Sequence, residues 1–251
     1  MSGHSHWATI RRKKGAQDAK RGALFTRLAR EIVMAAREGG GDPETNVRLA
    51  LAIEKARANN MPKDNIERAI KRGTGEDKEG SAIEQIMYEG YGPHGVALMI
   101  ECVTDNRNRA VAEIRHLLSR GGGNMAEVGA VGWQFDRKAY FVFPASALDY
   151  DKAFELAVEA GADDVSQDDD SIEITGPVEA FKSIGDKLRA AGVQVEEAGL
   201  RMIAKQEMDL TTEQTLSVMR LIESLEELDD VQNVYHNVRI SDEAWAALEA
   251  E

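Results

Sequence analysis

Residues 3–22 read GHSHWATIRRKKGAQDAKRG, and they begin a stretch of short helical segments from which the rest of the chain is interpreted. Between Met1 and Gly75 there are sixteen Lys and Arg residues against eight Asp and Glu, a net charge of +8. From Glu76 to Glu251 there are fifteen Lys and Arg against thirty-six Asp and Glu, a net charge of −21. The chain, with a total charge of −13, thus combines a basic module with an acidic body. A basic helical module predicts a polyanionic partner, most simply nucleic acid.

The composition predicts a globular protein. The chain has 251 residues, of which 43% are hydrophobic and 30% charged, and this length allows one to three domains. No apolar run approaches the roughly 18 residues that span a membrane, so no membrane partner is expected. The N-terminus is charged from Arg11 and has no apolar segment of a secretory signal. The single cysteine, Cys102, cannot form an intramolecular disulfide, and we therefore expect a cytoplasmic protein.

The basic module is predicted to be a compact helical bundle. Glycine or proline follows each of three expected helices, at residues 16–37, 42–59 and 63–72. In the first helix the apolar residues Phe25, Leu28, Ala29, Ile32 and Ala36 share one face. Four cations fall on the opposite face: Lys20, Arg27, Arg30 and Arg37. An apolar face against a basic stripe is typical of a helix that follows phosphates, although a solvated charged face has the same pattern.

A polar linker at residues 74–80 separates the bundle from a mixed pattern of strands and helices. Strands are expected at residues 83–91, 96–103, 131–135, 139–143, 163–165, 171–175, 193–196, 201–205 and 231–238. A turn at residues 136–138 is expected to separate the third strand from the fourth. Helices are expected at residues 106–120, 151–160, 178–191, 211–227 and 241–250, the fourth with a capping box at Thr211 and Gln214.

These elements predict an α+β fold, in which an N-terminal basic helical bundle precedes two ferredoxin-like α/β domains, one inserted into the other. Residues 137–199 have the complete β-α-β-β-α-β order of a ferredoxin-like unit. The segments before and after it are each half a unit, so we expect them to pair. The predicted domains are 1–78 (basic helical), 79–136 with 200–240 (split α/β) and 137–199 (inserted α/β), followed by a C-terminal helix at 241–251.

The predicted nucleic-acid contacts are cations of the arm and the first helix. Phosphates require cations on a surface that can follow a backbone, and four consecutive cations have little reason to lie in a core. The candidate residues are Arg11, Arg12, Lys13, Lys14, Lys20, Arg21, Arg27 and Arg30. His4 and His6 form only an isolated H-x-H pair, which does not predict a metal site.

A second candidate is an anion site at residues 104–109, TDNRNR, where a strand ends and a helix begins. The helix N-terminus together with Arg107 and Arg109 has the chemistry to bind a phosphate or a carboxylate. Ordinary capping by Asp105, with both arginines solvated or in ion pairs, explains the same residues equally well.

Other patterns favour structural roles. Gly121–Gly123 follows a helix and is expected to cap it, and Asp168–Asp170 is expected at a solvated hairpin tip. An aromatic cluster is expected in the core: Trp133, Phe135, Tyr140, Phe141 and Phe143. Cys102 lies within an expected strand, where a buried, inert thiol is usual. With no nucleophile-elbow, P-loop, C-x-x-C or H-E-x-x-H motif, the sequence predicts no enzyme, cofactor or metal.

Several segments together resemble the YebC family, which includes the mitochondrial translational activator of cytochrome c oxidase. They occur in the same order and cover nearly the whole chain: residues 3–32, residues 59–76 (NNMPKDNIERAIKRGTGE), residues 88–97 (YEGYGPHGVA), residues 104–124 and residues 129–138 (GAVGWQFDRK). The resemblance implies a three-domain α/β protein, cytoplasmic in bacteria. It assigns no catalytic residue.

The resemblance supports two functional hypotheses. The label usual in the family implies a DNA-binding regulator of transcription. The mitochondrial branch implies instead a translation factor that binds ribosomal RNA and relieves stalls at difficult stretches such as consecutive prolines. In that case the acidic body could face basic ribosomal proteins. A metabolite-sensing or catalytic α/β protein is a remote third hypothesis.

Overall fold

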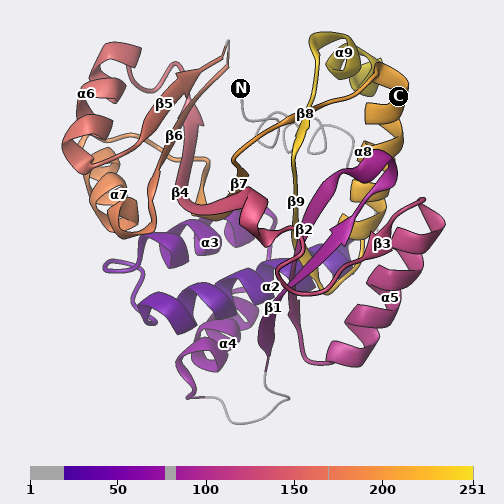
Figure 1. The fold of residues 1–251 in the computed structure, drawn as a ribbon. Coiled ribbons are helices and arrows are strands. Elements are labelled where there is room, and N and C mark those ends of the chain that lie inside the picture. The colour runs from indigo at the N-terminus through magenta and orange to yellow at the C-terminus, as the bar shows by residue number, and fades with distance from the viewer. Residues whose placement is uncertain (1–19, 77–82, 169, 251) are drawn as a thin grey trace. The chain divides into compact units, whose positions relative to one another are not determined.

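The computed structural model describes residues 20–76, 83–168 and 170–250 as a mixed α/β fold with helices and antiparallel sheets (Figure 1). The described residues divide into two compact units, one containing 24–76 and 137–201, the other 83–136 and 202–250. The expected helical module and the segment expected to be inserted therefore belong to the same unit. The division into three domains stays a prediction. Among the described helices, none is both long and apolar enough to cross a bilayer.

The basic module contains α2 (Lys20–Gly39), α3 (Val47–Ala58) and α4 (Lys63–Thr74). The predicted start of the second helix at residue 42 is wrong, because Asn46 caps α3 by accepting a hydrogen bond from the Leu49 N–H at 3.0 Å. The same Asn46 amide donates to the Ala35 carbonyl of α2 at 2.8 Å. Asp42 instead closes a turn, in which it accepts from the Glu44 N–H. One buried amide thus joins the end of α2 to the start of α3.

Helices α2 and α4 approach closely at a glycine. A Cβ atom on Gly73 would lie 2.5 Å from the Val33 carbonyl oxygen and 2.7 Å from the Ala36 Cβ. The absence of a side chain at Gly73 therefore sets the distance between the two backbones, and it fixes the position of the α4 face that points away from α2.

The same unit contains a ferredoxin-like sheet with the strand order β5-β6-β4-β7. Its strands are β4 (Phe135–Pro144), β5 (Asp164–Gln167), β6 (Ser171–Pro177) and β7 (Glu197–Ala204). Its helices are α6 (Tyr150–Ala160) and α7 (Phe181–Ala190), the latter preceded by the 3₁₀ turn η3 (Val178–Ala180). The core between sheet and helices includes Phe141, Phe143, Ile172, Ile174 and Ile184.

Two predictions about the strands of this region are wrong. The expected strands at 193–196 and 201–205 are a single strand, β7, which begins at Glu197. The expected pair at 131–135 and 139–143 is also a single strand, because β4 runs without a turn through residues 136–138. Residues 132–134 form the 3₁₀ turn η2 (Gly132–Gln134) rather than a strand.

A buried carboxylate explains why residues 129–132 form no strand. Glu89 is 7% exposed and accepts backbone hydrogen bonds from Gly129 and Val131 at 2.7 Å and from Gly132 at 2.8 Å. Burial by itself would raise the Glu89 pKa, but the three backbone donors outweigh it and hold the pKa below its ordinary value. These N–H groups are occupied by the carboxylate and cannot pair with a neighbouring strand.

The second unit contains a four-stranded antiparallel sheet in the order β3-β1-β2-β9. Its strands are β1 (Glu84–Tyr91), β2 (Ala97–Thr104), β3 (Asn124–Met125) and β9 (Val231–His236), with the 3₁₀ turn η1 (Pro93–Gly95) between β1 and β2. Its helices are α5 (Arg107–Arg120), α8 (Thr212–Glu226) and α9 (Asp242–Ala250). A short parallel pair joins β8 (Met208–Asp209) to β10 (Val238–Arg239). The expected capping box of α8 is confirmed at Thr211 and Gln214.

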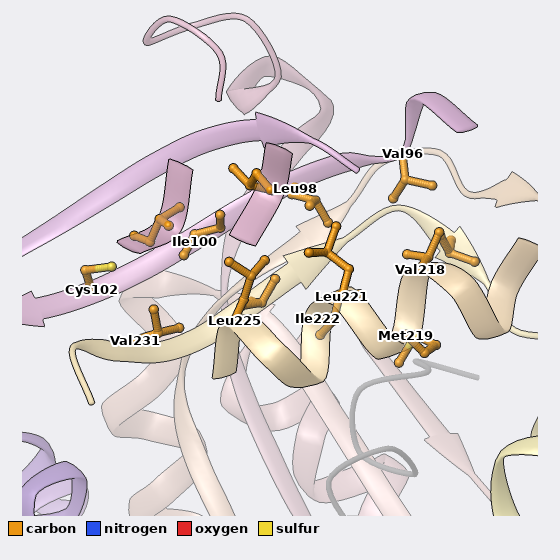
Figure 2. Close-up of a cluster of buried hydrophobic side chains, with 14 of the residues drawn as sticks. Val96, Leu98, Ile100, Cys102, Val218, Met219, Leu221, Ile222, Leu225 and Val231 are labelled. Carbon is orange, nitrogen blue, oxygen red and sulfur yellow. The ribbon is translucent and has the colours of Figure 1, made fainter. Parts of the chain in front are cut away.

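Strand β2 lies at the centre of this unit, and all eight of its residues are buried. Leu98, Ile100 and Cys102 face α8, where Leu221 and Leu225 point toward them (Figure 2). The alternate residues Ala97 and Met99 pack on the other side of the sheet in a second cluster: Val131, Phe135 and Tyr235. The strand is thus covered on both faces.

The approach of α2 and α4 predicts the effect of changing Gly73→Ala. In an isolated helix this change would stabilise by about 1 kcal/mol. Here the new methyl group meets backbone at 2.5 Å, so we expect a net loss of about 1–3 kcal/mol in the free energy of unfolding. Urea denaturation measures it. The matched control is Gly199→Ala, where an added Cβ meets nothing within 4 Å; a stabilised Gly73→Ala protein would contradict the packing described.

Burial of His236 predicts a pH dependence of stability. Its Nδ1 accepts a hydrogen bond from the Val238 N–H, and burial lowers its pKa from 6.5 to about 4. Between these values the unfolded chain binds a proton that the folded chain does not, so stability falls as the pH falls through this window. We expect a contribution of up to about 3 kcal/mol. Denaturation of the parent and of His236→Gln between pH 7 and 4 measures it, and equal pH slopes in the two proteins would refute it.

Candidate nucleic-acid interface

The structure leaves part of the predicted interface outside its description. Arg11, Arg12, Lys13 and Lys14 lie outside the described residues, as do His4 and His6. Lys20 and Arg21 belong to the first turn of α2, and their side chains are not among those described. The contacts predicted for these residues stay predictions.

The predicted solvent-facing basic stripe of α2 is wrong in its middle turns. Arg30 is only 9% exposed and Arg27 is half-buried. The five consecutive residues Ile32–Ala36 are all buried, whereas a surface helix would expose some of them. The physical reason is that α2 has neighbours on more than one side, since α4 meets it at Val33 and Asn46 meets it at Ala35. Arg30 is therefore not an exposed phosphate contact.

Helix α4 carries an exposed basic face that was not predicted from the sequence. Ile66 and Ala69 are buried, while Lys63, Arg68 and Lys71 are exposed on the other side of the helix. Lys63 pairs with Glu67 at 3.5 Å. Arg68 and Lys71 form no ion pair with any residue that the structure describes. The signal was present, because these two cations lie three residues apart, opposite the apolar spacing of Ile66 and Ala69.

Helix α3 contains both paired and unpaired cations. Arg48 pairs with Glu38, and Lys55 pairs with Glu31 at 3.1 Å. Arg57 near the C-terminus of α3 is exposed, and it has no ion-pair partner within the described ranges. Arg57, Arg68 and Lys71 are therefore available to an anion from solution, and we call these three residues the α3–α4 cations.

The candidate anion site at Arg107 and Arg109 is occupied by the protein's own carboxylates. Arg109 donates from Nε and Nη2 to Asp230 at 2.9–3.0 Å, and the Asp230 side chain is only 2% exposed. Its hydrogen bonds with Asp230 hold the Arg109 pKa above the ordinary value. Arg107 lies 3.7 Å from Glu84. Both arginines are thus paired, and Asn106 rather than Asp105 caps α5.

The other motifs have the structural roles that the sequence favoured, with one exception. Gly121 follows the last turn of α5. Asp168 accepts from the N–H groups of Asp170 and Ser171 in the turn before β6, and no group of three potential metal ligands occurs among the described residues. The cluster Phe135, Tyr140, Phe141 and Phe143 is buried as predicted. Trp133 is the exception: it is 68% exposed, and its indole N–H donates to the Ala130 carbonyl.

Comparison with known proteins matches both parts of the chain to one family. Residues 5–76 match the family described as the TACO1/YebC protein N-terminal domain. Residues 83–238 match the TACO1/YebC second and third domain. A crystal structure of a conserved hypothetical protein from Aquifex aeolicus is similar, with a TM-score of 0.79, 42% sequence identity, and coverage of 90% of this chain and 93% of that one.

Curated relatives match over essentially their whole length. A protein of Acidithiobacillus ferrooxidans is 53% identical over 100% of this chain and 99% of its own. A protein of Geotalea uraniireducens is 51% identical over 97% of this chain and 98% of its own. Both bear the name "Probable transcriptional regulatory protein". On the strength of these matches, the chain belongs to the TACO1/YebC family.

Proposed function

We propose that the protein is a regulator of gene expression that binds nucleic acid through its basic module and catalyses no reaction. The α3–α4 cations carry the proposal, since they are exposed, unpaired among the described residues, and part of a segment with a net charge of +8. The names of the relatives, probable transcriptional regulatory proteins, support a regulatory role.

The chemistry of these cations favours phosphate over base recognition. Lys and Arg neutralise phosphates and release counterions, whereas readout of base edges usually needs amide side chains or bidentate arginines in a groove. Arg68 and Lys71 lie on the same outward face of α4, which is rigidly placed by the contact of Gly73 with α2. The acidic remainder, with a charge of −21, is repelled by a polyanion and leaves this module as the contact surface.

Two nucleic-acid partners fit this chemistry, duplex DNA and ribosomal RNA. A surface that reads phosphates carries little sequence information, which is a poor basis for promoter recognition. The same surface suits a structured RNA, whose backbone is recognised largely by shape. We therefore favour ribosomal RNA, with a role in translation, as the second form of the proposal. A metabolite-sensing role loses its strongest candidate residues, because Arg107 and Arg109 face carboxylates.

The first functional prediction concerns the salt dependence of binding. In Arg68→Gln/Lys71→Gln we expect weaker binding to duplex DNA and to structured RNA. Removing one phosphate-binding cation should flatten the slope of log affinity against log salt by about 0.9 on duplex DNA. Titration of labelled nucleic acid across a salt series measures both quantities.

The matched control for this experiment is Arg115→Gln/Arg120→Gln, which removes two exposed cations from α5 in the acidic body. We expect its affinity and slope to equal those of the parent. A third variant, with Arg11, Arg12, Lys13 and Lys14 changed to Ala, tests the arm separately. If the α4 variant keeps the parental slope, α4 makes no phosphate contact; if the arm variant keeps it too, binding through the basic module is refuted.

The second functional prediction separates the two partners. We expect the protein to sediment with ribosomes at moderate salt and to bind a candidate promoter and its scrambled counterpart equally well. Ribosome association should weaken in Arg68→Gln/Lys71→Gln and persist in Arg115→Gln/Arg120→Gln. A clear promoter preference without ribosome association would instead establish the DNA form of the proposal.

A further inference from the structure

Helix α6 presents an apolar stripe to solvent. Tyr150, Phe154 and Val158 follow one another at intervals of four residues, so they lie along one side of the helix. Their exposed fractions are 37%, 48% and 59%, and no other helix that the structure describes has a large hydrophobic side chain this exposed. The core does not require the stripe, because α6 packs on its own sheet through Ala153, Ala157 and Ala160.

The stripe has a fixed shape. The rings of Tyr150 and Phe154 lie 6.4 Å apart between centroids in a tilted pair. The Tyr150 hydroxyl donates to the Val165 carbonyl of the edge strand β5 at 3.2 Å, which holds the ring in place. Eight residues of helix give the stripe a length of about 12 Å, comparable to two turns of a partner helix. A rigid aromatic surface of this kind loses little conformational entropy on binding.

A row of acidic side chains runs directly beside the apolar stripe. Each of its members follows one stripe residue in the sequence: Asp151, Glu155 and Glu159. All three are exposed; Glu159 pairs with Lys187 of α7, and Lys152 is the one cation within α6. The whole segment 137–201 has fourteen Asp and Glu against seven Lys and Arg, a net charge of −7. The stripe is thus an apolar strip in a negative field.

We propose that the α6 stripe is a docking site for a basic amphipathic helix of a protein partner. The apolar side of such a helix covers Phe154 and Val158, and its Lys or Arg residues face Asp151 and Glu155. The charge decides against the other occupants. A second copy of α6 would bring two acidic rows together, and nucleic acid would meet the same carboxylates. This site is separate from the basic module, so it adds a protein partner to the nucleic-acid partner proposed above.

A synthetic peptide of about four helical turns tests the site on the full-length protein. The probe carries Leu at i, i+3, i+4 and i+7 with Lys and Arg beside them. A second peptide replaces every Lys and Arg by Glu, and a third keeps the composition but scatters the Leu residues around the helix. We expect the first peptide to bind at least about tenfold more tightly than either control, with an affinity that falls as salt rises.

Three variants locate the binding. Phe154→Gln/Val158→Gln should weaken the basic peptide by about tenfold or more. Glu155→Lys should also weaken it and reduce the salt dependence. Glu113→Lys, the same charge change on the exposed face of α5, should leave binding unchanged. Because the substituted side chains are exposed, far-ultraviolet circular dichroism should match the parent; if the double variant misfolds, Glu155→Lys still decides.

Several outcomes would overturn the proposal. They are failure of the basic peptide to bind, equal binding of the acidic or scattered peptide, and unchanged binding to Glu155→Lys. Sedimentation equilibrium without peptide tests the second-copy alternative, since self-association that disappears in Phe154→Gln/Val158→Gln would assign the stripe to a dimer instead. Nucleic-acid binding by Phe154→Gln/Val158→Gln should equal that of the parent, so this test fails or succeeds independently of the proposed function.

Discussion

The burial of β2 on both faces is the constraint on which the second unit depends. A strand with every residue buried needs a layer on each side of its sheet, and neighbouring strands to satisfy its backbone. Helix α8, from the last third of the chain, supplies one layer through Leu221 and Leu225. Strand β9, also from this part, pairs with β2. Residues 83–136 alone could not complete this core, and for that reason both parts of the chain belong to one unit.

The second face of the same sheet buries two carboxylates, and it does so through neutral donors. Glu101 accepts hydrogen bonds from Gln85, Asn233 and Tyr235, and Glu89 accepts three from backbone N–H groups. Neutral donors of this kind offset the loss of hydration and fix a single geometry, because each must point at the oxygens. Through Glu89 they determine the path of the chain before β4, and with it the exposed position of Trp133.

Most helices and strands were predictable from local pattern, because their caps and apolar spacing are written in consecutive residues. The capping box at Thr211 is one example. The failures share a cause, which is that a distant side chain competes for the backbone. Residues 129–132 look like a strand until Glu89, forty residues earlier, takes their N–H groups. Asn46 likewise moves the start of α3 because it serves α2 as well.

The candidate site was less predictable than the fold. Charge composition identified the basic module, but it could not tell which cations reach solvent. Arg30 has the helical spacing of an exposed residue, yet α2 is covered on that side too. Arg109 has the position of an anion ligand, yet Asp230, from 121 residues away, occupies it. Burial and ion pairing depend on contacts between segments, and a helical wheel drawn for one segment does not contain them.

The row of carboxylates on α6 also has a consequence for the protein in solution before any partner arrives. Exposed aromatic and aliphatic side chains on a helix normally promote clumping, and charges of one sign placed beside them act as gatekeepers that keep copies apart. Asp151 and Glu155 occupy that position next to Phe154. The arrangement lets the cell store the protein at high concentration with a sticky surface uncovered, provided the carboxylates stay ionised.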